Sequence, residues 1–362
     1  MRSRSLSRRS ALRLTFALVG GSVVLQTAPA GAQETGRAVG WSDDLGGNDL
    51  LDVASTVAPI SSIIRNIGGN RINLRGIVPD GVNSHTFEPA PSDAAILASA
   101  DVLIANGLDL EVPTIELAEA NLPDGAEIFT LGDKVITPEE YAYDFSFPRE
   151  GGHPNPHLWT NVPYAMEYAR LIEGKLSELD PENADYVASN LERYLTRLEE
   201  LDAAIQATVD SIPAANRKLL TYHDSWAYFA PNYGMEVIGA IQPSDFSEPS
   251  PKEVADLIDQ IREVQVPAIF GSEVFPSPVL EQIASEGGAE YYDDLRDDEP
   301  PGDVDAPEHT FVGMMLRNLE IMATALGGDP SLLAGVSRKT LFSIRRRGCR
   351  CDAFSRGSAP RV

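Results

Sequence analysis

Along most of the chain, short apolar runs alternate with longer segments whose apolar positions recur at helical spacing. In the first such pair, an apolar run at residues 51–56 precedes a segment that opens at Pro59, places four isoleucines on one helical face and ends at Gly68-Gly69. This alternation is typical of βα units that assemble a parallel sheet. The predicted strands are residues 51–56, 72–78, 101–105, 218–222, 237–241 and 267–271, and further predicted helices are residues 92–100, 251–264, 278–287 and 314–326.

One helix should be much longer than the others. Asp180-Pro181 is a favourable helix start, because Asp caps the first turn and Pro fits the first helical position. From there to Ser211 no Pro or Gly interrupts the chain, and leucine recurs at helical spacing. Such a helix would be about 45 Å long, enough to connect two lobes. We therefore predict an α/β protein with two (β/α) lobes, residues 48–178 and 213–327, joined by one long rigid linker helix at residues 179–212.

The N-terminus is typical of a cleaved export signal. Residues 1–13 carry five Arg and no acidic side chain, residues 14–25 are apolar but too short to span a bilayer, and Ala30-Gly31-Ala32 matches a cleavage site. Arg8-Arg9 resembles a twin-arginine signal, and an ordinary secretory signal with incidental arginines is the alternative. We predict that residues 1–32 are a signal peptide and that the mature protein is soluble and periplasmic or otherwise extracytoplasmic. No Cys follows the cleavage site, which argues against a lipid anchor.

The charge is distributed unevenly. The chain has 29 Lys and Arg against 54 Asp and Glu, a net charge of −25. Without residues 1–32 and the basic end at residues 337–362, 16 basic and 53 acidic side chains remain, a net charge of −37. So acidic a body repels phosphate backbones, which argues against nucleic-acid partners and suits a cation. Both cysteines, Cys349 and Cys351, lie in the basic tail, which we predict to be disordered; a functional basic tail is the alternative.

Three of the five histidines lie where α/β sheets build their sites, in loops beyond strand ends. His85 follows the second predicted strand, His157 opens a helical region, and His223 comes directly after a strand. Any one of them alone would more often be a structural loop histidine. Together they favour a divalent-metal site, because neutral imidazole is the commonest metal ligand in proteins. A carboxylate would complete the set, and we expect Asp293 to supply it, with its neighbour Asp294 as the alternative.

The other two histidines are less informative. His153 lies in a loop rich in Pro and Gly, where it is either a transient relay ligand for the metal or, as we favour, a solvent-exposed residue. His309 lies in an acidic segment that contains several prolines, and we expect it to be exposed.

Around these positions the chain resembles a known family. It is similar, over residues 52–326, to the periplasmic metal-binding solute-binding proteins of ABC importers, in the class that carries zinc or manganese. The motifs that carry the resemblance are Val82-Asn83-Ser84-His85-Thr86-Phe87-Glu88-Pro89, Asn155-Pro156-His157-Leu158-Trp159, His223-Asp224-Ser225-Trp226, Tyr292-Asp293-Asp294-Leu295 and Met314-Met315-Leu316-Arg317-Asn318. Each motif alone would be weak evidence, but jointly they are specific.

The resemblance implies two (β/α) lobes with a rigid linking helix and one metal ion in the cleft between the lobes. It also implies a ligand set of His85, His157, His223 and Asp293. The chain departs from the family pattern in two respects. Asn155 replaces the usual Asp two residues before His157, and the loop before this ligand lacks the His- and acid-rich insertion that zinc members often carry.

Resemblance and donor chemistry together predict a monomer that captures zinc and delivers it to the membrane permease of an ABC importer. Imidazole suits zinc, whereas manganese prefers more oxygen ligands, so a manganese-binding member of the same class is the alternative. Three His and one Asp leave no open position for an activated water, which argues against an enzyme. A secreted zinc hydrolase, with Asp224 or Glu273 as its base, and a cell-surface adhesin are the weaker alternatives.

Overall fold

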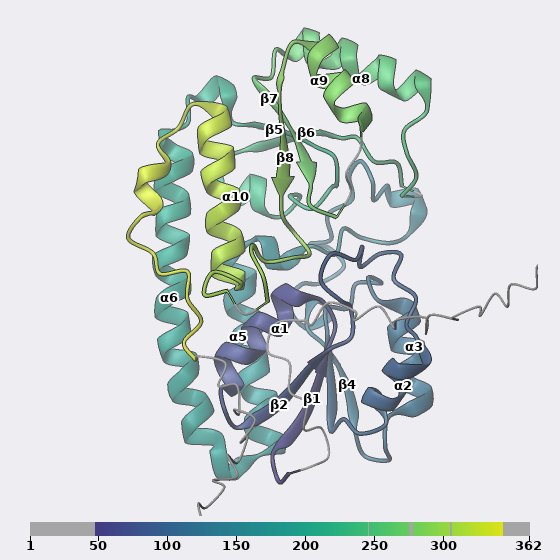
Figure 1. Ribbon diagram of the computed structural model, residues 1–362, viewed down its shortest axis with the longest axis vertical. Coiled ribbons are helices and arrows are strands. Elements are labelled where there is room, and N and C mark those ends of the chain that lie inside the picture. Colours follow the sequence, from purple (N-terminus) through teal and green to yellow (C-terminus); the bar gives the residue numbers. More distant parts are fainter. Residues whose placement is uncertain (1–47, 245, 275–277, 305, 343–362) are drawn as a thin grey trace, which may run out of the picture. The chain divides into compact units, whose positions relative to one another are not determined.

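The computed structural model describes residues 48–342 except 245, 275–277 and 305, and Figure 1 labels its elements. The predicted signal peptide and the part of the basic tail that holds Cys349 and Cys351 lie outside the described residues. Within the described part of the chain, no helix combines the length and the apolar character needed to span a membrane.

The first lobe is built on a four-stranded parallel sheet with strand order β2-β1-β3-β4. Alternate residues of each strand face opposite sides. Val53 and Val102 pack with helices α1 and α5, whereas Ala54 and Leu103 pack with residues of α2 and α3. Helices therefore cover both faces, as the βα alternation predicted. The elements are β1 (Leu51–Ser55), α1 (Ala58–Gly68), β2 (Ile72–Gly76), α2 (Pro91–Leu97), β3 (Val102–Ala105), α3 (Val112–Asn121), β4 (Glu127–Thr130), α4 (Gly132–Val135) and α5 (Val162–Leu179).

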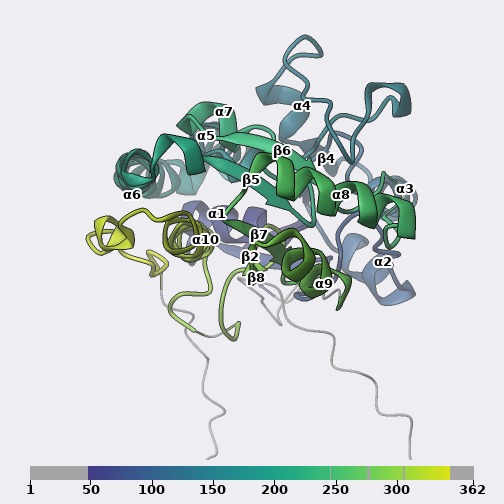
Figure 2. The same cartoon turned by 90° about the horizontal axis from the view of Figure 1, so that it is seen from above.

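The second lobe repeats this plan with a parallel sheet of order β6-β5-β7-β8. Leu219 and Phe270 pack in the cluster that includes α10, whereas Leu220 and Ile269 pack with α8 and α9. Figure 2 shows α8 and α9 on one side of this sheet and α10 on the other. The elements are β5 (Lys218–Thr221), α7 (Phe229–Tyr233), β6 (Glu236–Ala240), α8 (Pro251–Val264), β7 (Ala268–Ser272), α9 (Pro278–Gly287), β8 (Glu290–Leu295) and α10 (Phe311–Leu326).

Helix α6 (Ala184–Ser211) has 28 residues and lies between the two sheets in the chain. It packs against α1, α5 and α10, and its inner face buries Leu198, Leu201 and Ile205 completely. In Figure 1 it runs past both sheets. The helix expected at this place is therefore present, but it begins five residues later than predicted because a 3₁₀ turn, η3 (Pro181–Asn183), precedes it. Its role as a rigid linker stays a prediction.

Two parts of the fold differ from the sequence prediction. Strand β4 and helices α3, α4 and α7 were missed, and β8 was given no predicted range; β4 buries only Phe129, and α3 buries only Thr114 and Ala118. The start of the tail predicted to be disordered is instead packed onto the body. The backbone N–H of Leu341 donates to Asn66 Oδ1 (2.8 Å). The remaining 3₁₀ turns are η1 (Arg149–Gly151), η2 (Leu158–Thr160), η4 (Ala214–Asn216) and η5 (Pro330–Leu333).

Candidate metal centre

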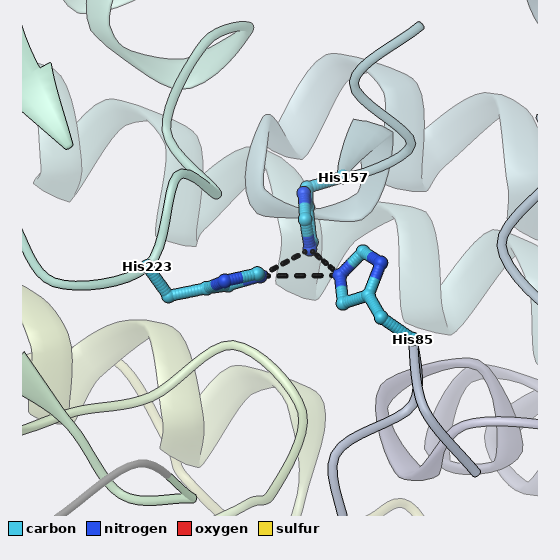
Figure 3. A group of neighbouring side chains, drawn as sticks. All are labelled: His85, His157 and His223. Atoms are coloured by element: carbon cyan, nitrogen blue, oxygen red, sulfur yellow. Dashed lines mark hydrogen bonds between the residues drawn. The ribbon is translucent and has the colours of Figure 1, made fainter. Parts of the chain in front are cut away.

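The structure brings together three histidines that are far apart in the sequence. His85 lies in the loop after β2, His157 directly precedes η2, and His223 lies two residues beyond the end of β5. Their Nε2 atoms are 3.1 Å (His85 to His157), 3.2 Å (His85 to His223) and 3.0 Å (His157 to His223) apart. Figure 3 shows the three rings pointing their Nε2 atoms at one another. His157 and His223 are buried, and His85 is half-buried.

Hydrogen bonds to amide oxygens determine which ring nitrogen carries the proton in two of these histidines. His157 Nδ1 lies 2.8 Å from Asn155 Oδ1, and His223 Nδ1 lies 2.8 Å from Gln242 Oε1. Asn155 is oriented in turn, because its Nδ2 donates to the backbone oxygen of Asp224 (2.7 Å). An amide oxygen can only accept, so each Nδ1 carries the hydrogen and each Nε2 presents a lone pair. Two converging lone pairs repel one another unless a cation lies between them.

A carboxylate lies beside two of the three histidines. Asp297 Oδ2 is 3.4 Å from His223 Nε2 and 3.6 Å from His157 Nε2. Asp297 is 2% exposed, and its Oδ2 has no hydrogen-bond partner among the described residues. Metal–nitrogen bonds of about 2.0–2.1 Å in a tetrahedron put neighbouring ligand atoms roughly 3.3–3.4 Å apart. The three Nε2 atoms, which lie within reach of one another, and the contacts of Asp297 with His157 and His223 are all close to this value, so the three histidines could hold a zinc-sized ion with Asp297 next to two of them.

Asp293, the carboxylate expected from the sequence, does not reach this group. It lies exposed within β8, because the strand continues to Leu295 and the loop toward the histidines begins only after it. The alternative, Asp294, pairs instead with Arg296 (2.7 Å) and Arg317 (3.1 Å). We therefore replace Asp293 by Asp297 in the candidate ligand set. The sequence signal that could have identified Asp297 is its place as the first acidic residue after Leu295, the last apolar position of this segment.

Several groups hold the Asp297 loop in place. Glu273 Oε1 accepts the backbone N–H groups of Asp297 (3.1 Å), Asp298 (3.1 Å) and Glu299 (3.0 Å). Trp159 Nε1 donates to the backbone oxygen of Asp297 (2.9 Å). The loop also meets the other lobe, because Asp298 Oδ2 accepts both the backbone N–H (3.1 Å) and the hydroxyl (2.8 Å) of Ser84, the neighbour of His85. From its place at a strand end, Glu273 was expected to support the site structurally, and it does so here; the particular contacts of this network were not predicted.

The other histidines lie outside the cluster. His153 is 70% exposed and its Nδ1 pairs with Asp109 Oδ2 (2.9 Å), as expected for a loop residue. His309 was expected to be exposed but is buried, with Nδ1 against the backbone oxygen of Gly302 (3.1 Å) and Nε2 3.5 Å from Asp80 Oδ2. The acidic segment around His309 folds back onto the body, so its polar composition was a poor guide to exposure.

Burial sets the protonation of the metal-free cluster. It lowers the pKa of His85 and His157 well below the ordinary value, and the neighbouring His223 adds to this effect. Burial also lowers the pKa of His223, to about 4. The pKa of Asp297 is raised well above its ordinary value, first by burial and then by neighbouring carboxylates. Although Asp297 and the imidazoles lie within ion-pair distance, these shifts favour the neutral forms of both. The imidazoles are thus already deprotonated at neutral pH, as metal binding requires.

These pKa shifts predict how the metal-free protein responds to acid. The unfolded chain takes up protons on histidine below about pH 6.5, whereas folded His223 does so only near pH 4. Stability should therefore be lost as the pH falls from about 6.5 to about 4, by up to about 3 kcal/mol for His223 alone. NMR titration of the ring Cε1–H resonances checks this: cluster midpoints near 6.5 would contradict it.

The fold and the site define a class of protein: two α/β lobes that present a buried His-rich metal centre from loops of both sheets. The model of the family described as "Zinc-uptake complex component A periplasmic" matches residues 53–325. The chain belongs to this family of metal-binding proteins. Its members are substrate-binding components of ABC transporters and not enzymes. In agreement, the two residues considered as hydrolytic bases are engaged structurally: Asp224 Oδ2 accepts the backbone N–H of Ser146 (3.0 Å), and Glu273 holds the Asp297 loop.

Individual relatives cover almost the whole body of the chain. Manganese-binding lipoprotein MntA of Halalkalibacterium halodurans is 27% identical over 315 residues, covering 87% of this chain and 99% of the relative. The manganese ABC transporter substrate-binding lipoprotein PsaA of Streptococcus pneumoniae is 27% identical over 289 residues, covering 77% and 90%. Among solved structures, the periplasmic zinc-binding protein TroA of Treponema pallidum matches with a TM-score of 0.69 and 27% identity, covering 76% of this chain and 98% of TroA.

Proposed function

We propose that this protein captures zinc outside the cytoplasm and delivers it to the membrane permease of an ABC importer. The observation that carries the proposal is the convergence of three imidazole Nε2 atoms, two of them with their lone pairs directed inward by an amide oxygen. Three nitrogen ligands and one carboxylate suit zinc better than manganese, which prefers oxygen ligands. Manganese is the alternative cargo, because the relatives are named for either metal.

We infer that His85, His157, His223 and Asp297 are the ligands. Two of them come from the first lobe and two from the second, so the ion would sit in the cleft between the lobes and hold them together. Release to the permease would then require the lobes to separate. We further propose that residues 1–32 direct export of the protein and that it acts as a monomer, with residues 179–212 as the link between its lobes.

Metal analysis of protein purified without added metal tests the proposal. We expect about one zinc per chain. A His85→Ala variant should retain no zinc after dialysis, because loss of one ligand weakens the binding of the ion. A His153→Ala variant is the matched control, since His153 is exposed and outside the cluster. Wild-type protein that neither retains nor takes up any divalent metal would overturn the proposal, and manganese in place of zinc would establish the alternative cargo.

A His223→Glu variant tests the basis of the metal preference. It exchanges a nitrogen ligand for an oxygen ligand at one position, and Gln242 can turn its amide so that Nε2 donates to the new carboxylate. We expect the ratio of zinc to manganese affinity to fall by roughly 10-fold or more, as measured by competition with a chelator. An unchanged ratio would mean that the donor type at this position does not set the preference.

A further inference from the structure

One of the three histidines lacks the anchor that orients the other two. His157 and His223 each donate Nδ1–H to an amide oxygen. The Nδ1 of His85 has no hydrogen-bond partner among the described residues. The backbone N–H of His85 donates to Asn83 Oδ1 (2.9 Å), which fixes the main chain but not the rotation of the ring. Something else must hold this imidazole at the angle that points Nε2 into the cluster.

An aromatic ring from the other lobe lies flat against it. The ring of Phe246 is stacked on the His85 imidazole, with centroids 4.6 Å apart and an interplanar angle of 22°. Phe147 contacts the same imidazole at a tilt, 5.6 Å between centroids, and also contacts Phe246 at 6.1 Å. Phe147 is 7% exposed and Phe246 is half-buried. The imidazole is therefore held by ring contacts rather than by a hydrogen bond.

The backbone of Phe246 is unusual for its residue type. Its φ is +58°, in the left-handed region that a bulky side chain seldom adopts. Such a conformation persists only where the surroundings enforce it, and it is found mainly at functional sites. Here the turn is closed by a hydrogen bond from the Phe246 N–H to the backbone oxygen of Pro243 (3.0 Å). This strained turn is what brings the ring over His85.

The same turn is linked to a second ligand. Gln242, whose Oε1 accepts the Nδ1–H of His223, places its Nε2 3.5 Å from the backbone oxygen of Phe246. Gln242 also accepts the hydroxyl of Ser146 on its own backbone oxygen (2.6 Å), and Ser146 is the neighbour of Phe147. One glutamine thus contacts the ligand His223 and both segments that carry the aromatic rings.

We propose that Phe246 is the positioning residue of His85, so that an aromatic ring of the second lobe orients a metal ligand of the first. This inference rests on the proposed function and names a residue outside the ligand set. Stacking requires the two lobes to be together, so His85 is fully oriented only when they are. Loss of the ring should free the imidazole to rotate and so open the ion to exchange.

The dissociation rate of zinc into a chelator tests this inference on the full-length protein. A Phe246→Ala variant should release zinc roughly 3- to 10-fold faster than wild type, the range that corresponds to one aromatic pair. Phe246→Tyr keeps the stacked ring and should restore the wild-type rate. Phe145→Ala is the matched control, because Phe145 is 48% exposed and close in sequence to Phe147.

A spectroscopic signature separates positioning from a general structural role. In the cobalt-substituted protein, the Nδ1–H signals of His157 and His223 should persist in the Phe246→Ala variant, whereas the ring signals of His85 should broaden. Equal dissociation rates and unchanged His85 signals would overturn the inference while leaving the proposed function intact. Wild-type protein that binds no metal at all would instead remove the proposed function, and this inference with it. Thermal unfolding of each variant confirms that it is folded.

Discussion

An Asp297→Asn variant should lose tight zinc binding, whereas Asp293→Asn should bind as the wild type does. Asp297 Oδ2 is buried within 3.4–3.6 Å of two ligand nitrogens, while Asp293 is exposed on β8. Replacing even an outer-shell partner of a metal ligand costs about 10- to 100-fold in affinity, so removal of the carboxylate that we propose as a ligand should cost at least about 100-fold. Isothermal titration or chelator competition measures both variants.

The stability of the same variant distinguishes a ligand from a structural residue. Burial and neighbouring carboxylates raise the pKa of Asp297 well above its ordinary value, so the metal-free fold disfavours its charge. An amide of the same shape avoids that charge, and the metal-free Asp297→Asn protein should be at least as stable as wild type in urea. Zinc should then stabilise the wild type and the Asp293→Asn variant but not Asp297→Asn. Equal stabilisation of all three would exclude Asp297 as a ligand.

The sequence predicted the histidines better than the carboxylate, for a physical reason. Imidazole is scarce in this chain, and each of the three histidines falls in or beside a loop that leads to the cluster. Carboxylates are abundant, and the choice among them depends on where β8 ends. The strand runs two residues beyond Asp293, because Leu295 packs into the core. The loop that carries the carboxylate therefore starts later in the chain than the choice of Asp293 implied.

The contacts that support the histidine cluster could not be predicted from the pattern of residues along the chain. The two-lobe plan and the long helix follow from local periodicity and from short connections between neighbouring elements. The contacts of Glu273 with the Asp297 loop, of Asp298 with Ser84 and of Phe246 with His85 join segments 24 to 214 residues apart. Such contacts depend on how the two lobes meet, which no local pattern encodes. His309 illustrates the same limit: its acidic surroundings predicted exposure, but tertiary packing buries it.

Removal of the Glu273 side chain should weaken both the fold and the metal site. Glu273 Oε1 accepts three successive backbone N–H groups, of Asp297, Asp298 and Glu299, and no other described side chain accepts from them. A Glu273→Ala variant leaves these donors without a partner, which should lower the free energy of unfolding by about 3 kcal/mol. The freed loop should also lower zinc affinity by roughly 10- to 100-fold. Urea unfolding and chelator competition measure the two effects.

Glu273→Gln is the matched control, and it adds a dependence on pH that only the carboxyl group can produce. Burial, followed by the charge of Asp298, raises the pKa of Glu273 to about 7. A carboxyl group whose pKa is raised in the folded state contributes stability below its unfolded pKa of about 4.5, and this contribution is lost as the pH rises through about 7. Between pH 5.5 and 8 the free energy of unfolding of the metal-free wild type should thus fall by up to about 2 kcal/mol, and that of Glu273→Gln should not.

The amide keeps a neutral acceptor for the three N–H groups, so the stability of Glu273→Gln should match that of wild type at the lower pH. Parallel pH profiles for the two proteins would show that Glu273 is ionised in the folded state throughout this range, and that the loop is held by a charged acceptor instead of a neutral one.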